Sequence, residues 1–206
     1  MNILLLGSGG REHAIAWKLS NSKKLGKLFI APGNAGTNDV GINVNLNTSN
    51  FKTIEKFILK ENIHILIVGP ENIIVRGIYD YLKPLCPNLI IIAPSQKASL
   101  LEGSKRFAKE FMKKNNIPTA NYNSFKKKQL KEALDYLGTI SPPFVLKADG
   151  LAGGKGVVIL DNRLDAEKEL KEMLIDNKFG VASNEVLIEE FLSGIELSVF
   201  VLTNGS

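Results

Sequence analysis

Short apolar runs and stretches with helical spacing alternate along the first 93 residues. The apolar runs predict strands over 2–6, 28–31, 63–68 and 89–93, and the helical spacing predicts helices over 11–19, 51–58 and 74–83. We expect the first helix to be buried, and the strand over 63–68 to be parallel and covered on both faces. This alternation predicts an α/β fold whose N-terminal part is an open, Rossmann-like parallel sheet.

The pattern changes after residue 103. Ser104 is predicted to cap a helix over 104–115, and Pro118 marks a boundary. The order that follows is a short strand from Tyr122, a helix over 129–137, apolar runs over 144–146 and 157–160, a helix over 164–177, and strands over 186–190 and 196–202. We therefore expect a parallel α/β domain over 1–120, a small α+β unit over 121–190 and the first strand of another domain over 191–206. Asn204-Gly205 is a hairpin-turn signal without a returning strand, so we expect the chain to be unfinished.

Composition is that of an ordinary soluble protein. Hydrophobic residues make up 44% of the 206 positions, charged residues make up 23%, and the net charge is +5. Lysines are scattered, and the one dense run, Lys126 to Lys128, is expected to be a solvated helix end and not a nucleic-acid site. Small anionic substrates suit this charge balance.

The single cysteine, Cys86, excludes an intramolecular disulfide and a Cys-rich metal site. We expect it to be buried, and one unpaired cysteine fits a reducing compartment. The chain begins directly with a strand-like run, and no apolar run reaches the length of a membrane span. We therefore expect a cytoplasmic protein without a signal peptide or a membrane partner.

The stretch from Phe144 to Leu160 reads FVLKADGLAGGKGVVIL and predicts a β-hairpin with a glycine-rich tip. Lys147 ends its first run, and Gly150, Gly153, Gly154 and Gly156 surround Lys155. Bare backbone N–H groups and a lysine suit a phosphate chain. The stretch is no Walker loop, because Asp149 stands where the first glycine belongs and Gly156 follows the lysine. A flexible hairpin with a solvated lysine is the alternative.

A second glycine-rich turn, Gly7-Ser8-Gly9-Gly10, joins the first strand to the first helix. It resembles a dinucleotide fingerprint, but Glu12 occupies the third glycine position and no acidic residue closes the second predicted strand. A nicotinamide or flavin enzyme is therefore disfavoured. The turn is still suited to anions, with Arg11, Glu12 and His13 beside it. It is alternatively a tight turn in which Glu12 merely favours the helix start.

Other candidate side chains lie at predicted strand or helix ends. Glu71 follows the strand over 63–68 and either holds a ligand or is a loop acid. Lys105 opens a helix, where a bound anion would explain a cation. Glu189 and Glu190 end a strand shortly before Leu192 and Glu196, and are either solvated or present groups to a nucleotide. His64 lies within an apolar run and is expected to be structural.

Seven stretches resemble one family, and they follow each other in that family's order. They are GSGGREHAIAW (7–17), APGNAGT (31–37), IVGPE (67–71), LEGSK (101–105), IPTA (117–120), KADGLAGGKGV (147–157) and IEEFLSGIELS (188–198). The family is phosphoribosylamine–glycine ligase, also called glycinamide ribonucleotide synthetase, of the ATP-grasp superfamily. The stretches cover the chain almost end to end, and GREHA with KADGLAGGKG is highly specific. The resemblance identifies 121–190 as an ATP-grasp lid and 191–206 as the start of the main ATP-grasp domain.

The resemblance implies an ATP-dependent ligase of purine biosynthesis. Its substrates would be ATP, glycine and 5-phosphoribosylamine, and no side chain would act as a nucleophile. Lys105 and Lys147 would contact the ATP phosphates, and the loop over 150–156 would close over them. Glu189, Glu190 and Leu192 would meet the adenine, partly through backbone groups, and Glu196 would meet the ribose. Gly9, Gly10, Arg11, Glu12 and Glu71 would form part of the phosphoribosylamine site.

The chain departs from the family pattern by ending early. The family continues into a part that holds the carboxylate and asparagine ligands of Mg²⁺ or Mn²⁺, so we expect no metal ligands here and no turnover by these 206 residues alone. A separate C-terminal half would then be a partner. The alternatives are a non-catalytic ligand-binding fragment, and a related ATP-grasp ligase that uses another carboxylate.

Overall fold

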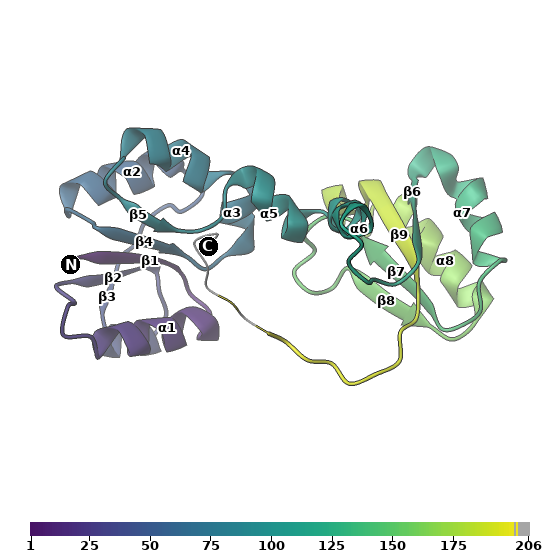
Figure 1. Ribbon diagram of the computed structural model, residues 1–206, viewed down its shortest axis with the longest axis horizontal. Coiled ribbons are helices and arrows are strands. Elements are labelled where there is room, and N and C mark those ends of the chain that lie inside the picture. The colour runs from purple at the N-terminus through teal and green to yellow at the C-terminus, as the bar shows by residue number, and fades with distance from the viewer. Residues whose placement is uncertain (200, 202–206) are drawn as a thin grey trace. The chain divides into compact units, whose positions relative to one another are not determined.

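The computed structural model describes residues 1–199 and 201. The chain divides into two compact units, Met1–Ala108 and Lys109–Ser206 (Figure 1). Each unit has its own sheet and its own hydrophobic core. The finer domain limits expected at 120 and 190 stay predictions.

The first unit is built on a parallel sheet, as the alternating pattern predicts. Its strands are β1 (Ile3–Gly7), β2 (Leu28–Pro32), β3 (Ile42–Asn43), β4 (Ile65–Val68) and β5 (Ile90–Ile92). They lie in the order β3-β2-β1-β4-β5, and all neighbouring pairs are parallel. The strand order therefore reverses between β1 and β4, which is where ligands bind in sheets of this kind.

Helices cover both faces of this sheet (Figure 1). Helix α1 (Gly10–Ser20) packs on one face through Ala16, against a cluster that includes Leu5 and Ile30. Helices α2 (Phe51–Lys60) and α4 (Ile78–Leu85) cover the other face, where Ile58 and Leu82 are buried. The near-continuous apolar character of β1, β2 and β4 follows from this two-sided cover, whereas Ile90 and Ile92 of β5 stay exposed.

Four features of the first unit differ from the sequence prediction. The two-residue strand β3 was not predicted. The single helix expected over 74–83 is two helices, α3 (Glu71–Val75) and α4, because Gly77 adopts a left-handed φ of 86° between them. The helix α5 (Gln96–Gly103) was not predicted, since its apolar residues do not follow a helical period. Helix α1 is not fully buried: Trp17 is 59% exposed, because only one side of this helix meets the sheet.

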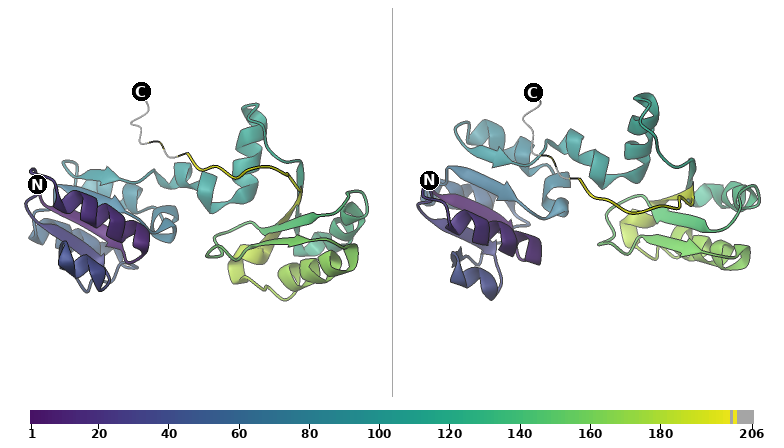
Figure 2. Two further views of the ribbon diagram at one scale, coloured as in Figure 1. Left: turned by 90° about the horizontal axis from the view of Figure 1, so that it is seen from below. Right: turned by 60° about the horizontal axis from the view of Figure 1, so that its bottom comes forward.

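The second unit is the predicted α+β arrangement. Its strands are β6 (Tyr122–Lys126), β7 (Phe144–Ala148), β8 (Val157–Leu160) and β9 (Glu185–Glu190), in the antiparallel order β6-β9-β7-β8. Strands β7 and β8 form the predicted hairpin. Helices α7 (Leu130–Leu137) and α8 (Arg163–Leu174) cover one face and enclose Leu146 and Ile188, and the light green α8 lies against the sheet in both views of Figure 2.

Helix α6 (Lys105–Lys114) joins the two units in sequence. The Phe107 N–H donates to Ser104 Oγ at 3.1 Å, which confirms the predicted cap. Within residues 1–199 and 201, no helix is long and apolar enough to span a membrane.

The strand expected over Glu196–Leu202 is wrong in its described part. Residues 191–199 and 201 have no regular secondary structure, because no other described segment pairs with them and an unpaired strand leaves its backbone groups unsatisfied. Residue 202 lies outside the described residues. The side chains of Ile195, Leu197, Val199 and Val201 are between 77% and 99% exposed.

Candidate functional site

One face of the second sheet, opposite the face that α7 and α8 cover, carries two of the predicted ATP-binding side chains, Lys147 and Glu189. The strand register sets Lys147 opposite Val157 and Leu187, and sets Val145 opposite Ile159 and Glu189. Directly opposed residues of an antiparallel pair share a face, so these six residues lie together. We call them the lysine face. Val157 and Ile159 leave apolar surface exposed beside the charged groups.

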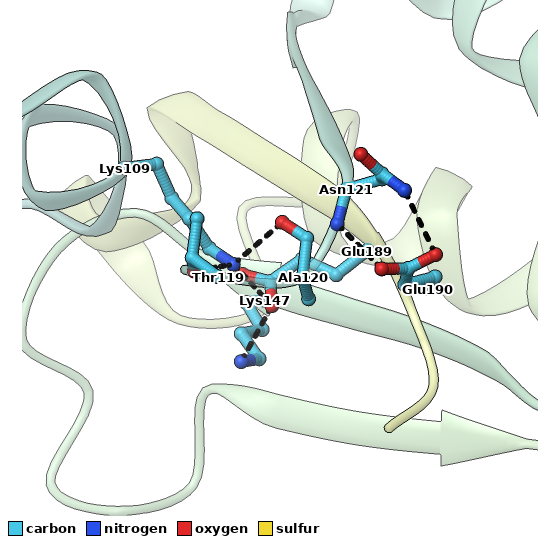
Figure 3. A network of polar contacts seen from close by, with 7 residues as sticks. All are labelled: Lys109, Thr119, Ala120, Asn121, Lys147, Glu189 and Glu190. Atoms are coloured by element: carbon cyan, nitrogen blue, oxygen red, sulfur yellow. Dashed lines mark hydrogen bonds and ion pairs between the residues drawn. The ribbon is translucent and has the colours of Figure 1, made fainter. Parts of the chain in front are cut away.

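Glu189 is the centre of the lysine face. Its side chain is only 3% exposed, and its Oε2 atom lies 2.9 Å from Lys147 Nζ and 3.1 Å from Lys109 Nζ (Figure 3). Its Oε1 atom is buried without a hydrogen-bond partner among the described residues. The alternative that Glu189 is solvated is therefore wrong. Its carboxylate is buried, and its charge is compensated by ion pairs and not by water.

The two lysines that hold Glu189 differ in their surroundings. Lys109 Nζ also donates to Thr119 Oγ1 at 2.9 Å and to the Ala120 carbonyl at 3.1 Å, and its side chain is 9% exposed. It further lies 5.5 Å from the centre of the Tyr122 ring. Lys147 is 27% exposed, and within residues 1–199 and 201 its Nζ atom contacts only Glu189. Lys147 is thus the cation that a ligand can reach.

Glu190 does not join Glu189, although the two are adjacent in sequence. The register sets Glu190 opposite Phe144, on the face that α7 and α8 cover. The backbone N–H and the side-chain amide of Asn121 donate to its two oxygens at 2.9 and 3.0 Å (Figure 3). The backbone hydrogen bond from Asn121 lowers the pKa of Glu190, and the side-chain hydrogen bond lowers it further. Only the backbone of Glu190 remains for a ligand on the lysine face.

The glycine loop of the hairpin is closely packed at its two ends, whereas its tip has open space around it. A Cβ atom at Gly150 would lie 3.0 Å from Ala182 Cα, and one at Gly156 would lie 2.7 Å from Ala152 Cβ. Gly153 and Gly154 have φ values of 58° and 79°, and a Cβ atom there would meet nothing within 4 Å. Lys155 is exposed. The tip therefore has the space and the backbone freedom to approach a phosphate chain.

The candidate site of the first unit lies where the strand order reverses. The predicted phosphoribosylamine residues follow β1 and β4: Gly9 caps α1, Gly10, Arg11 and Glu12 open α1, and Glu71 opens α3. Arg11 and Glu71 form an exposed ion pair, with 3.5 Å between Arg11 Nη2 and Glu71 Oε1. Glu71 also lines a cavity of about 200 Å³ whose other walls are mostly apolar and include Ile74 and Pro94. Arg11 remains accessible to an anion at this edge.

Glu12 is buried inside this site and is held by backbone. Its Oε2 atom accepts the Gly9 N–H at 2.8 Å, which caps the start of α1. A Cβ atom at Gly7 would lie 2.4 Å from Glu12 Cγ, and one at Gly69 would lie 2.3 Å from Glu12 Oε1. Glu12 therefore fills the space between the two turns and supports them from behind. This agrees with the helix-start role that the sequence left open as an alternative.

The remaining predicted residues lie elsewhere in the chain. Lys105 is the first residue of α6, and Leu192 and Glu196 are exposed in the segment after β9. Their shared contact with one nucleotide stays a prediction. His64 precedes β4, is exposed, and its Nδ1 atom accepts the Asn2 N–H at 3.0 Å, while Cys86 is buried as predicted. Among residues 1–199 and 201, no three His, Cys, Asp or Glu side chains gather where they could hold a metal ion.

Sequence reasoning missed Lys109. A signal was available, because Lys105 and Lys109 stand four residues apart on the predicted helix. Like charges at this spacing destabilise a helix unless acidic groups face them. The structure supplies such a group to Lys109 in Glu189.

Two family models match the chain. Residues 1–102 match the N domain of phosphoribosylglycinamide synthetase, and residues 103–206 match its ATP-grasp (A) domain. Together the two matches cover the whole chain.

Curated relatives and solved structures agree with these matches. The chain is 47% identical over 205 residues to phosphoribosylamine–glycine ligase of Fusobacterium nucleatum and 44% identical over 207 residues to that of Haemophilus influenzae. Each alignment covers 100% of this chain and 47% of the relative, so the chain spans about half the length of these relatives. The crystal structure of the Thermotoga maritima phosphoribosylamine–glycine ligase superposes with a TM-score of 0.73 at 33% identity, over 95% of this chain and 45% of that one. A D-alanine–D-alanine ligase from Bacillus anthracis, at 18% identity and a TM-score of 0.64, shares the fold.

Proposed function

Because this chain belongs to the phosphoribosylglycinamide synthetase family, we propose that it forms part of an ATP-dependent ligase that joins glycine to 5-phosphoribosylamine. The part present would bind the phosphates and the base of ATP, and would contribute to the phosphoribosylamine site. The free, buried Cys86 fits the reducing cytoplasm, where we place the reaction.

The proposed reaction transfers the γ-phosphoryl group of ATP to the glycine carboxylate. The amine of 5-phosphoribosylamine then attacks the acyl phosphate, and phosphate leaves. The products are glycinamide ribonucleotide, ADP and phosphate, as de novo purine biosynthesis requires. Since both steps use groups of the substrates themselves, the protein acts by positioning them and by neutralising charge.

The lysine face is the observation that carries the proposal. It combines an accessible ammonium group, Lys147, with exposed apolar surface at Val157 and Ile159. A nucleotide has the matching parts, a phosphate chain and a flat base. In this arrangement Lys147 holds the phosphates, and the loop over 150–156 closes over them with its N–H groups.

The adenine and ribose contacts would come from the chain after β9. The backbone of Glu189, Glu190 and Leu192 would meet the adenine edge, and Glu196 would meet the ribose. Lys105 would add a second phosphate contact. The engagement of the Glu190 carboxylate by Asn121 supports a backbone role for this residue.

At the first sheet we propose that Gly9, Gly10, Arg11 and Glu71 contact phosphoribosylamine. Backbone N–H groups at the start of a helix together with a guanidinium suit its phosphate. Glu12 would act indirectly, by fixing the turn that presents these groups.

Magnesium or manganese would neutralise the transferring phosphoryl group in the complete enzyme. The described residues 1–199 and 201 offer no cluster of three ligands, so we propose that the metal ligands belong to the part of the relatives that this chain does not cover. We therefore propose that the 206 residues do not turn over alone and need a C-terminal half, on the same or a separate polypeptide. A non-catalytic ligand-binding fragment is the second candidate.

The test is ADP formation from ATP, glycine and phosphoribosylamine, paired with the intact mass of the natively expressed protein. The chain is assayed alone and with the uncovered half of the Fusobacterium nucleatum relative supplied as a second polypeptide. We expect no turnover alone, glycine-dependent turnover with the added half, and a loss of about 100-fold or more in Lys147→Met. Lys178→Met is the matched control, because Lys178 is also paired to carboxylates but lies outside the lysine face.

Other outcomes would change the assignment. Turnover by the 206 residues alone would contradict the proposed need for the second half. A folded pair of halves without turnover would favour the non-catalytic fragment. Turnover that prefers another amino acid to glycine would indicate a related ligase with a different carboxylate substrate.

A further inference from the structure

The cluster around Glu189 carries a surplus of positive charge. One buried carboxylate faces two ammonium groups, and both approach the same oxygen, Oε2. A single lysine would already neutralise Glu189. Glu190 also attracts Lys109 electrostatically, but among the described residues only Glu189 lies within ion-pair distance of it, so two lysines at Glu189 are more than this carboxylate needs.

The two lysines are not equivalent. Each ammonium group has three N–H donors. Lys109 donates two, to Thr119 Oγ1 and the Ala120 carbonyl, lies 3.1 Å from Glu189 Oε2 in an ion pair, and is almost completely buried. Lys147 uses one, on Glu189, and is three times as exposed in its side chain, at 27% against 9%. Lys109 is fixed, whereas Lys147 is free to turn away.

We propose that Lys109 is a positioning residue, the permanent counter-ion of Glu189 that allows Lys147 to leave this carboxylate for an anionic phosphate chain. If Lys109 were absent, departure of Lys147 would leave a buried carboxylate unpaired, which is strongly unfavourable. With Lys109 in place, Glu189 stays paired whether Lys147 is on it or on the ligand. The ligand half of this proposal rests on the proposed function, in which Lys147 contacts the phosphates of ATP.

A purely structural role for Lys109 makes a different prediction. In that case its contacts with Thr119 and Ala120 only tie α6 to the chain before β6. Loss of Lys109 would then lower stability without tightening the hold of Glu189 on Lys147. The chemical reactivity of Lys147 separates the two roles, because an ion-paired ammonium group resists the deprotonation that acylation requires.

The experiment measures the rate at which an amine-reactive reagent acylates Lys147 in the full 206-residue chain, by peptide mass spectrometry. The exposed Lys113 is the internal standard. We expect Lys109→Met and Lys109→Gln to slow acylation of Lys147 by about 10-fold, because Lys147 becomes the sole partner of Glu189. The double variant Lys109→Met with Glu189→Gln removes the carboxylate and should restore at least the original rate. Lys109→Arg, which keeps the charge, should change the rate by less than about threefold.

Lys178→Met is the matched control. Lys178 also contacts two charged side chains of this unit, Glu169 and Glu172, at 2.7 and 2.9 Å. Its loss should leave the acylation rate of Lys147 unchanged. Circular dichroism checks that each variant is folded. If Lys109→Met does not fold, the acylation rates of Lys109→Gln and of the double variant still decide between the two roles.

Protection by ATP separates this proposal from the proposed function. We expect ATP to protect Lys147 from acylation in the unsubstituted chain, and Lys109→Gln to need about 10-fold more ATP for the same protection. One outcome is slower acylation of Lys147 in the Lys109 variants without protection by ATP in any chain, the unsubstituted one included. This outcome would support the counter-ion role of Lys109 and contradict the contact between Lys147 and the ATP phosphates. An unchanged acylation rate in both Lys109→Met and Lys109→Gln would overturn the counter-ion role.

Discussion

Glu12 in the first unit and Glu189 in the second are both buried carboxylates beside a predicted ligand site. Glu12 accepts a backbone N–H and is enclosed by glycines of two turns. Glu189 is held by two lysine side chains and keeps one oxygen without a hydrogen-bond partner among the described residues. The resemblance assigned both to ligand binding, but of the two only Glu189 contacts a partly exposed lysine side chain, Lys147.

The difference lies in what neutralises each carboxylate. A backbone N–H cannot leave without unfolding the turn that carries it, so Glu12 is permanently part of the fold. A lysine has a long flexible side chain and can exchange one acceptor for another. Buried acids satisfied by backbone are therefore expected to affect stability, and buried acids satisfied by mobile cations are expected to affect binding as well. The predictions below test this distinction.

The largest effect should come from breaking the charged cluster of the second unit. Glu189→Ala leaves the buried Lys109 without its carboxylate, and we expect a loss of about 3–5 kcal/mol in the free energy of unfolding. Lys109→Met with Glu189→Gln removes both buried charges and should lose clearly less. Urea unfolding, with hydrogen exchange of the β9 amides as a local readout, measures both. Equal losses in the two variants would contradict the charge argument.

A glycine substitution in the first unit should have the next largest effect. Gly7 has a φ of 132°, and a Cβ atom there would lie 2.4 Å from Glu12 Cγ. We expect Gly7→Ala to cost about 2–3 kcal/mol, since backbone strain adds to displacement of the buried Glu12. Gly10→Ala is the matched control, because a Cβ atom at Gly10 meets nothing within 4 Å. Hydrogen exchange of the α1 amides should report the loss only in Gly7→Ala.

Glu12→Ala should have a smaller effect on stability and no effect on the second unit. Loss of the helix cap at Gly9 is expected to cost about 1–2 kcal/mol in the free energy of unfolding. Acylation of Lys147 in the second unit should not change. A variant that unfolds normally but loses ATP protection of Lys147 would show that Glu12 acts on binding, against the comparison.

The smallest effect should be a pH dependence of the free energy of unfolding that comes from Glu190. The carboxylate of Glu190 accepts hydrogen bonds from the backbone and side-chain amides of Asn121. Asn121 lowers its pKa in the folded state, so Glu190 stabilises the protein above its ordinary carboxyl pKa of 4.5, and this contribution is lost as the pH falls through the lowered value. The difference in urea midpoint between the unsubstituted chain and Glu190→Gln should be constant from pH 7 to about 5 and shrink below it. A constant difference down to pH 3 would mean that Asn121 does not favour the charged form.

The sequence predicted the hairpin and the described strands other than the two-residue β3, because apolar periodicity reports burial directly. The apolar runs before Gly7, before Gly69 and around the 150–156 loop are all strands. The break at Gly77 was missed, since helical spacing continues on both sides of it and only the backbone angle reveals the interruption. The strand expected over 196–202 was wrong in its described part for a related reason, because alternation predicts a strand only where a described segment pairs with it.

The sequence predicted which residues belong to the candidate sites, but not which of their side chains contact one another. Sequence adjacency grouped Glu189 with Glu190, whereas the pleat of β9 sends their side chains to opposite faces. The burial of Glu12 depends on Gly7 and Gly69, which come from two distant segments. Lys109 lies 80 residues before Glu189, so no local motif contains the pair.

The bare side chains after β9 have a consequence for the behaviour of the protein in a crowded solution. Ile195, Leu197, Val199 and Val201 stand at every second position and lie exposed, an apolar stripe interrupted by the single charge of Glu196. Such a stripe is a template for edge-to-edge aggregation between copies and a recognition signal for chaperones. A carboxylate introduced at Leu197 should raise the concentration at which the chain precipitates, because charge on such a stripe opposes pairing between copies.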